Sequence, residues 1–420
     1  MNKKVLSWCL FDFANSSYSA VIAAVIFPVY YANVIVGNET GLGDLWWGRA
    51  IALSMAAVAL SSPFLGGIAD YAKVRKKLLI FYTLLCIASV ASFYFLHKGM
   101  VIEGFILIVL ANIGMEGGLV FYNSFLPEIS ETTHQGRVSA WGFGVGYAGS
   151  IISLLLALFL IKKGFMSMTW PMVALFFGIF SLPAFVFLPK DKQGDFVMGT
   201  SSTLCGAAMD GLRYAWKTLK KIWTNKEQRK FLMAYLIYED GVNTVIVFSS
   251  IFAATTLQFK PEELIGMYLI VQTTALIGAF LMARPIDCWG PKKVVMLSLS
   301  MWIVVSIAAF FVQTKTQFFI IASIAGLGLG TVQAATRAFY TQFIPDGQES
   351  EYFGVYSLVG KSSAIIGPLV FGYLSSAFGS QRPAILSVAL FFLIGLIIIK
   401  TVKGGGPNVL KTITSLQGRI

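Results

Sequence analysis

Six ionisable side chains lie within long apolar stretches of the sequence. They are Asp12, Glu116, Glu239, Asp240, Arg337 and Lys361. A charged side chain at the centre of a lipid bilayer costs about 2.5–3.5 kcal/mol, so each of these groups needs a partner or a functional role. Buried carboxylates can bind an ammonium group or carry a proton, and Arg and Lys can bind a carboxylate.

Two of the acids begin the same short motif. Asp12-Phe-Ala-Asn15-Ser16 and Asp240-Gly-Val-Asn243-Thr244 both read Asp-x-x-Asn-(Ser/Thr). Positions i, i+3 and i+4 share one face of a helix, so each motif presents three polar groups together. Two interpretations are open: these groups bind a solute or a coupling ion, or they hydrogen-bond neighbouring helices.

The other polar candidates also have alternative roles. Arg337 forms a permanent bridge to Asp240, anchors a substrate carboxylate, or changes partners between conformational states. The role of Lys361 is open between the same kinds of alternative. Glu239 is adjacent to Asp240 in the sequence, so its side chain points to a different side of the helix, and we expect it to face a neighbouring helix. The tyrosines of these segments are expected to pack rather than to stack on a substrate; they are Tyr18, Tyr122, Tyr238 and Tyr340.

The elements that hold these residues must be membrane-spanning helices. Of 420 residues, 56% are hydrophobic and 12% are charged, whereas a soluble domain carries about 25% charged residues. A helix needs about 20 apolar residues to cross the hydrocarbon core. Twelve such segments occur, at 6–36, 46–69, 78–97, 101–126, 138–161, 170–188, 231–257, 264–286, 294–313, 317–343, 353–378 and 382–400.

Five of the buried charges are expected at a similar depth. At a helical rise of about 1.5 Å per residue, each lies about 12–16 Å from the basic end of its segment. That depth is near the middle of a hydrocarbon core of about 30 Å. The five residues are Asp12, Glu116, Asp240, Arg337 and Lys361.

The formal net charge of +12 follows the membrane topology. Twenty-three of the 32 Lys and Arg residues fall in connections on one side and seven on the other. Positive charge is retained on the cytoplasmic side, so we expect both termini in the cytoplasm and no nucleic-acid partner. The first apolar segment is too long for a signal peptide and is expected to remain as a helix.

Residues 189–230 interrupt the pattern of apolar segments. A polar stretch is followed by Met209–Lys230, in which Leu, Ala and Trp recur at helical spacing among Lys and Arg. We expect a cytoplasmic connector with an amphipathic helix on the membrane surface. It separates a six-helix bundle at 1–188 from a second bundle at 231–400, and a cytoplasmic tail follows at 401–420.

The two halves repeat each other at nearly constant separations. Besides the Asp-x-x-Asn motifs, the end of the fourth segment, Phe121-Tyr122…Pro127-Glu128, matches Phe339-Tyr340…Pro345-Asp346 in the tenth. Asp70 with Arg75-Lys76-Lys77 after the second segment matches Asp287 with Lys292-Lys293 after the eighth. Three matches in the same order indicate duplication.

Two parallel six-helix repeats with a basic turn after helices 2 and 8 resemble the major facilitator superfamily. Gly66-x-x-x-Asp70 with the following basic residues is similar to its loop signature, although an extra residue intervenes and no Gly follows Asp70. The second copy keeps Gly290. The opening Trp8-x-x-Phe11-Asp12-Phe-Ala-Asn15-Ser16-x-Tyr18, with Phe27-Pro28 downstream, resembles the branch of autophagy-related vacuolar amino-acid effluxers and their bacterial relatives.

The superfamily's drug/proton antiport signatures in helices 4 and 5 are missing from this sequence.

The resemblance implies roles for two sets of residues. The basic turns are expected to control a gate, with plain charge topology as the alternative; their residues are Gly66, Asp70, Arg75, Lys76, Asp287, Gly290 and Lys292. Substrate binding or coupling is expected from Asp12, Asn15, Ser16, Glu116, Tyr122, Asp240, Asn243, Arg337, Tyr340 and Lys361.

We therefore expect an all-α polytopic protein of twelve helices in two pseudo-symmetric bundles, acting as a secondary transporter by alternating access. A cavity with acids and bases suits a small polar or zwitterionic solute such as an amino acid, with efflux implied by the resemblance. Proton coupling through Asp12, Asp240 or Glu116 is a further hypothesis. The alternative is a lipid or lysolipid transporter on the same fold.

Several other functions are not expected. The four cysteines are scattered without a metal-binding spacing, and His97 and His134 fall at opposite membrane faces. These patterns offer no nucleophile–base pair or metal set, so we expect no enzyme activity, no metal and no cofactor. We expect a monomer in the bacterial inner membrane whose partners are membrane lipid, a small-molecule substrate and protons.

Overall fold

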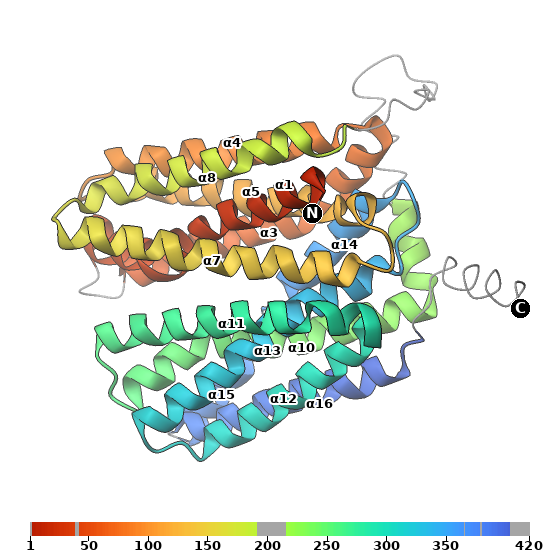
Figure 1. Ribbon diagram of the computed structural model, residues 1–420. Coiled ribbons are helices and arrows are strands. Elements are labelled where there is room, and N and C mark those ends of the chain that lie inside the picture. Colours follow the sequence, from red (N-terminus) through yellow and green to blue (C-terminus); the bar gives the residue numbers. More distant parts are fainter. Residues whose placement is uncertain (1, 38–41, 191–215, 365, 379, 404–420) are drawn as a thin grey trace, which may run out of the picture. The chain divides into compact units, whose positions relative to one another are not determined.

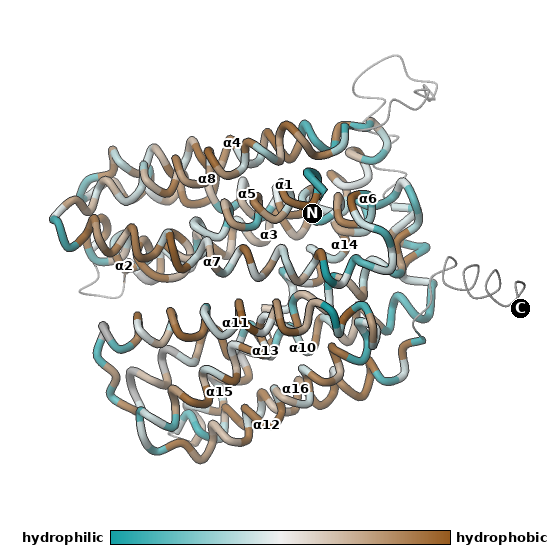
Figure 2. Tube along the Cα trace, in the orientation of Figure 1, coloured by the Kyte–Doolittle hydropathy of each residue, from teal (hydrophilic) through white to brown (hydrophobic). Residues whose placement is uncertain are grey.

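The computed structural model describes residues 2–37, 42–190, 216–364, 366–378 and 380–403, and within these ranges the regular structure is entirely helical (Figure 1). Ten of the described helices are long and apolar enough to cross a membrane, and a bent pair would make an eleventh. Figure 2 shows hydrophobic residues along the helices and hydrophilic residues concentrated at their ends. The chain is therefore an integral, multi-pass membrane protein.

The first segment is bent and partly π-helical rather than one regular helix. The part Lys3–Val25 meets Phe27–Val36 at 42°. Pro28 lies at the start of the second part, where it cannot donate the backbone hydrogen bond that a continuous helix needs. The elements are α1 (Lys3–Ser17), η1 (Tyr18–Val25), α2 (Phe27–Tyr30) and η2 (Tyr31–Val36).

The rest of the N-terminal half follows the expected segments closely. Its elements are α3 (Leu42–Ala72), α4 (Arg75–Ser92), η3 (Phe93–Phe95), α5 (Val101–Ser124), α6 (Leu126–Ile129), α7 (Gln135–Lys162), η4 (Met166–Met168) and α8 (Thr169–Phe187). The expected connector lies mostly outside the described residues. Its described end is helical over residues 216–224, with Trp216 and Trp223 exposed and Ile222 buried.

The C-terminal half contains α10 (Lys226–Thr255), α11 (Pro261–Trp289), α12 (Pro291–Phe310), α13 (Lys315–Thr341), α14 (Glu349–Ser362), α15 (Ile366–Phe378) and α16 (Gln381–Thr401). The expectation of one continuous helix over 353–378 was wrong, because α14 and α15 are separate helices. Pro368 lies in the first turn of α15, where its fixed φ and missing N–H are tolerated. Most of the expected tail lies outside the described residues.

The chain forms two compact units that do not coincide with the two halves of the sequence. Unit 1 comprises Met1–Ile129, Trp141–Trp216 and Ser350–Lys361, and unit 2 comprises Ser130–Ala140, Lys217–Glu349 and Ser362–Ile420. The beginning of α7 thus packs with the C-terminal helices, and most of α14 packs with the N-terminal helices. These two helix starts carry the contacts of the basic turns.

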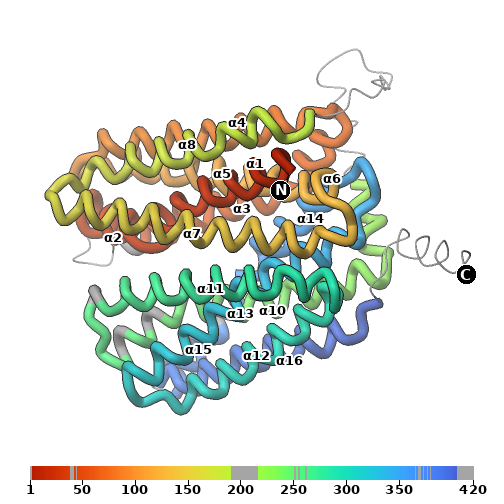
Figure 3. Tube along the Cα trace, viewed as in Figure 1, coloured from red at the N-terminus to blue at the C-terminus, as the bar shows by residue number. Residues whose placement is uncertain are grey.

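Close helix packing within each unit depends on small residues. In unit 1, α7 runs beside α1 (Figure 3), and a Cβ atom at Gly149 would lie 2.2 Å from the carbonyl oxygen of Phe13. In unit 2, a Cβ at Gly330 of α13 would lie 2.0 Å from the carbonyl oxygen of Ala275 in α11. Glycine at these positions lets the two backbones of each helix pair approach closely.

Candidate functional site

The first Asp-x-x-Asn-Ser motif is buried in unit 1. Asn15 donates from Nδ2 to Asp12 Oδ1 over 3.3 Å, and Ser16 Oγ donates to the backbone oxygen of Asp12 over 2.7 Å. The motif faces α7 at Gly146, where a Cβ would lie 2.9 Å from Ser16 Oγ and 3.6 Å from Asp12 Cβ. These three polar groups therefore sit on one packed helix face, as the spacing predicts.

The second motif is buried in unit 2 and repeats part of this arrangement. Thr244 Oγ1 donates to the backbone oxygen of Asp240 over 2.7 Å, as Ser16 does to Asp12. Asn243 differs from its counterpart because its Nδ2 donates to Ser363 Oγ over 3.1 Å, at the break between α14 and α15. The second motif thus reaches the interrupted eleventh helix.

Asp240 caps the second half of that helix. Its Oδ2 accepts a 2.8 Å hydrogen bond from the backbone N–H of Gly367, the second residue of α15. The first N–H groups of a helix have no partner within it, and a carboxylate there satisfies them and interacts favourably with the helix dipole. Asp240 is 2% exposed, so the contact is shielded from water. The geometry assigns a positioning role to this acid.

A half-buried ion pair joins α5 and α14 within unit 1. Lys361 Nζ lies 2.6 Å from Glu116 Oε2, and the two side chains are 26% and 14% exposed. One turn before Glu116, Asn112 donates to Ser54 Oγ over 2.6 Å and accepts from Tyr18 OH at 3.4 Å. Asn112 and Glu116 are four residues apart and share a face of α5.

The sequence predicted only part of this polar string, which consists of Tyr18, Ser54, Asn112, Glu116 and Lys361. The sequence singles out Glu116 and Lys361 by their charge, but it gives no reason to pair them. Asn112 and Ser54 were missed, although Asn112 carries a usable signal. It is an amide in an apolar segment, four positions before a carboxylate, where interhelical hydrogen bonding is expected.

Arg337 joins α13 to the beginning of α7 within unit 2. Its Nε donates to Ser139 Oγ over 2.9 Å, and its Nη2 donates to the Ser139 backbone oxygen over 2.7 Å. Ser139 Oγ in turn donates to the backbone oxygen of Ala334. Arg337 is buried, so these contacts give the guanidinium neutral acceptors inside the protein. Ser139 was not among the sequence candidates.

Tyr122 and Tyr340 are fully buried among aromatic rings. Tyr122 stacks on Trp8 and Phe11, with ring centroids 4.6 and 4.9 Å apart, and its backbone oxygen accepts from Trp8 Nε1. Tyr340 stacks on Phe231 at 5.5 Å. The repeated Phe-Tyr pairs therefore carry aromatic packing at the ends of the fourth and tenth segments.

The two repeated aspartates of the basic turns both bind the start of a helix. In unit 1, Asp70 accepts from the backbone N–H groups of Ser350 and Glu351 at 3.2 and 2.9 Å. In unit 2, Asp287 accepts from the N–H of Arg137 at 3.0 Å, and its side chain lies 3.3 Å from the Arg137 guanidinium. Each aspartate therefore links a helix of one sequence half to a helix start of the other.

Glycines make these contacts possible. A Cβ at Gly66, one turn before Asp70, would lie 2.3 Å from the Ser350 backbone oxygen. Gly290 adopts a φ of +87° between α11 and α12, in the left-handed region that favours glycine. Arg75 donates to the backbone oxygen of Ser124 and forms an ion pair with Glu128.

Two lysines expected at the gate cap helix ends inside their own units. Lys76 Nζ donates to the backbone oxygens of Leu188 and Val186 at 2.6 and 3.3 Å, just after α8 and in its last turn. Lys292 does the same at the end of α16, with Val402 and Lys400 as acceptors at 2.6 and 2.9 Å. Cations near helix C-termini satisfy terminal carbonyls and complement the dipole.

Within the described residues, no group of three or more His, Cys, Asp or Glu side chains gathers in a way that could hold a metal ion. The polar groups described above form hydrogen bonds and ion pairs with other residues of their own unit.

Comparison with known proteins identifies the family. Residues 49–404 match the family model "Vacuole effluxer Atg22 like". An uncharacterized MFS-type transporter, YxiO, of Bacillus subtilis is 26% identical over 410 residues, covering 94% of both chains. Autophagy-related protein 22-1 of Neosartorya fischeri is 26% identical over 314 residues, or 67% of this chain, which thus spans only 50% of that fungal relative.

Solved structures show the same fold at low sequence identity. The human organic anion transporter MFSD10 (TETRAN) superposes with a TM-score of 0.77 at 13% identity, covering 94% of this chain and 99% of that one. The Escherichia coli fucose:proton symporter FucP superposes with a TM-score of 0.70 at 13% identity, covering 95% and 98%. The chain belongs to the Atg22-like vacuole-effluxer family of major facilitator transporters.

Proposed function

We propose that the protein moves a small zwitterionic solute, of which an amino acid is the simplest, across the bacterial cytoplasmic membrane. The observation that carries this proposal is the ion pair between Glu116 and Lys361. A zwitterion brings a carboxylate for the lysine and an ammonium for the glutamate. Binding can therefore replace one ion pair by two without leaving either buried charge unpaired, which would cost about 2.5–3.5 kcal/mol.

Neighbouring polar groups support the same site. Asn112 and Tyr18 lie on the string that leads to Glu116, and such neutral groups can orient a solute by hydrogen bonding. The alternative, a lipid or lysolipid substrate, would match this pair of charges only if its headgroup were zwitterionic, whereas an amino acid carries both charges without an acyl chain that must also be accommodated.

Transport in this proposal proceeds by alternating access. The two sequence halves move relative to each other, and the Asp70 and Asp287 contacts act as latches at the starts of α14 and α7. In each latch, backbone N–H groups donate hydrogen bonds to the aspartate carboxylate, and these bonds can form and break as a unit. With both termini in the cytoplasm, as the distribution of Lys and Arg favours, these latches lie on the cytoplasmic side.

Proton coupling is assigned in this proposal to Glu116. Glu116 can bind the substrate ammonium only as a carboxylate, so proton uptake on Glu116 would weaken solute binding and couple release of the solute to the proton. Asp240 is occupied with the cap of α15, which makes it the less suitable carrier. In proteoliposomes, an imposed pH gradient should drive uptake or efflux of the solute; a rate that is unchanged by the gradient would remove the coupling hypothesis and leave the substrate proposal intact.

A ligand screen tests the substrate class. Purified protein is mixed with amino acids, short peptides or lysolipids, and its thermal unfolding is followed. We expect amino acids to raise the midpoint in the wild type and not in Lys361→Gln, while Lys292→Gln, which alters a lysine at a helix end, keeps the response. Stabilisation by lysolipids alone would reject the zwitterion proposal in favour of lipid transport.

A further inference from the structure

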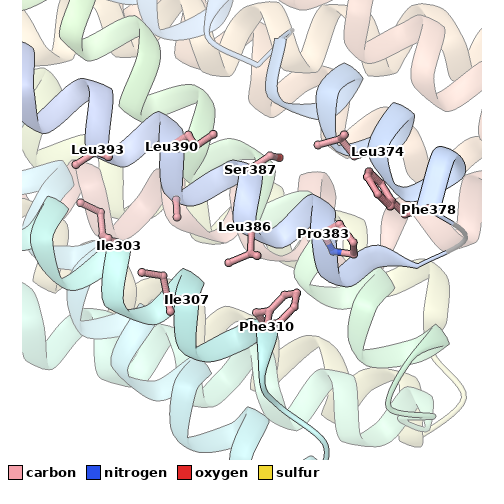
Figure 4. A pocket seen from close by; sticks show the side chains of 11 residues that line it. Ile303, Ile307, Phe310, Leu374, Phe378, Pro383, Leu386, Ser387, Leu390 and Leu393 are labelled. Atoms are coloured by element: carbon pink, nitrogen blue, oxygen red, sulfur yellow. The ribbon is translucent and has the colours of Figure 1, made fainter.

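An apolar groove lies on the surface of unit 2, away from the polar motifs. It has a volume of about 710 Å³ and is formed by α12, α15 and α16 (Figure 4). Its lining includes Ile307, Phe310, Phe378, Leu390 and Leu393. Ligand pockets in proteins typically have about 300–1,000 Å³, so the groove is large enough to hold part of an organic ligand.

The groove offers no free polar group along its length. Ser387 is the polar residue in its lining, and its Oγ is bonded to the backbone oxygen of Ala384 at 2.6 Å. Several lining side chains are open to the surroundings: Phe378 is 65% exposed and Leu390 is 56% exposed. Because α12 and α16 are membrane-spanning helices, these side chains face hydrocarbon, and an occupant must itself be apolar.

The dimensions of the groove match one acyl chain. It follows α16 from Pro383 to Leu393, a length of about 15 Å at the helical rise. Half of the hydrocarbon core, the share of one leaflet, is also about 15 Å. The groove therefore starts at one end of the helices and reaches about the depth at which one lipid tail ends.

A cation lies beside the groove, at the beginning of α16. Arg382 precedes the lining residue Pro383, and its guanidinium donates to the backbone oxygens of Phe310 and Val312 at the end of α12. It also lies 5.9 Å from the centre of the Phe252 ring. Among the residues that the structure describes, no carboxylate neutralises it. An arginine without a carboxylate partner at the depth of the headgroups keeps its net positive charge and is suited to a phosphate.

We propose that this groove is a binding site for one phospholipid of the leaflet that faces the α15–α16 connection, with an acyl chain along α16 and the phosphate on Arg382. This is the outer leaflet if the termini are cytoplasmic. The site is separate from the zwitterion site, because it contains none of the residues assigned there. Its occupant is held by the protein and is not the transported solute.

Delipidated protein titrated with phosphatidylglycerol, and followed by native mass spectrometry, tests the proposal. Arg382→Gln removes a charged hydrogen-bonding group, worth about 1.5–3 kcal/mol, so binding should weaken about tenfold or more. Arg382→Lys should retain most of the binding because it keeps the charge. Diacylglycerol, which lacks the phosphate, should bind the wild type as weakly as phosphatidylglycerol binds Arg382→Gln.

Filling the groove gives a second, independent test. Leu390→Trp should abolish retention of the lipid, and Ser387→Phe serves in its place if that variant does not fold. The matched control is Leu175→Trp, since Leu175 is the same residue of the Ala-Leu-Phe-Phe sequence shared by α8 and α16 and is also exposed. Lipid binding that survives both groove fillings, or that is lost equally in the control, would overturn the proposal. The proposal would also be overturned if the wild type formed a dimer without bound lipid and Leu390→Trp dissociated it. The groove would then be a contact between two copies of the chain.

Discussion

Removing the carboxylate of Asp240 should loosen α15 while leaving the rest of unit 2 folded. In Asp240→Ala the N–H of Gly367, bonded at 2.8 Å in the wild type, loses its acceptor in a buried place. An unsatisfied buried donor costs about 1–3 kcal/mol. Asp240→Asn keeps an acceptor oxygen and loses only the charge, whose interaction with a helix N-terminus is worth about 0.3–1 kcal/mol.

Hydrogen exchange of the peptide that covers α15 measures this effect directly. A loss of about 1.4 kcal/mol raises the population of the open state about tenfold. We therefore expect exchange in α15 to speed up about tenfold in Asp240→Ala and about two- to fivefold in Asp240→Asn. Peptides from α12 should exchange as in the wild type.

Asp12→Ala is the matched control. Asp12 begins the repeated motif but faces α7, a continuous helix at that point. Its removal should leave α15 unaffected. Unchanged exchange of α15 in Asp240→Ala, or acceleration of equal size in Asp12→Ala, would refute the capping role that we assign to Asp240.

Three further outcomes follow from the contacts of single residues. Gly367→Ala should destabilise the protein by about 1–3 kcal/mol through overpacking, because the new Cβ would lie 2.0 Å from Thr244 Oγ1. Gly146→Ala, whose nearest contact would be 2.9 Å, should cost less stability in the same thermal unfolding assay. Lys292→Ala should lower stability by about 0.3–1 kcal/mol, seen as faster exchange at the end of α16, and no change there would exclude the capping role. Asp287→Ala should lower the unfolding midpoint more than Asp287→Asn, because only the alanine variant loses the acceptor for the backbone N–H at the start of α7; equal midpoints would argue against that bond.

The sequence predicted the helical architecture well because its signal is physical and local. Long apolar segments must be helices in lipid, since lipid cannot satisfy backbone polar groups. The repeated motifs also correctly paired Asp12 with Asp240, and Asp70 with Asp287, as equivalent positions. Duplicated sequences place equivalent residues in equivalent environments, and both Asp70 and Asp287 indeed cap the start of a helix.

The interruption of the eleventh helix was not predictable from proline alone. Pro63, Pro183 and Pro285 all lie within continuous helices. In the eleventh segment, Asp240 from another helix caps the chain beside Pro368, and a local pattern does not record such a tertiary contact. The same limit explains why the sequence left open the partner of Arg337, which includes Ser139, nearly 200 positions away.

Pairing of the buried charges also required the structure. By depth, Lys361 could meet any of several carboxylates near the middle of the membrane. Only the packing of α14 against the helices of unit 1 brings it to Glu116. Conversely, Lys76 and Lys292 looked like parts of a gate because they follow the repeated aspartates, and the structure shows them at the ends of α8 and α16.

The central claim is that Glu116 and Lys361 bind the two charges of a zwitterion, and reversing the pair tests it most directly. Glu116→Lys and Lys361→Glu are made singly and together, and counterflow of radiolabelled neutral amino acids into proteoliposomes is measured alongside thermal stability. Each single variant should lose stability because it places two like charges together. The double variant should regain stability because opposite charges again face each other. It should fail to transport, because the solute's ammonium would meet a lysine at position 116 and its carboxylate a glutamate at position 361, while the neighbouring groups that orient the solute are unchanged. Wild-type counterflow in the double variant would show that the pair serves only to stabilise the fold and would contradict the proposed site.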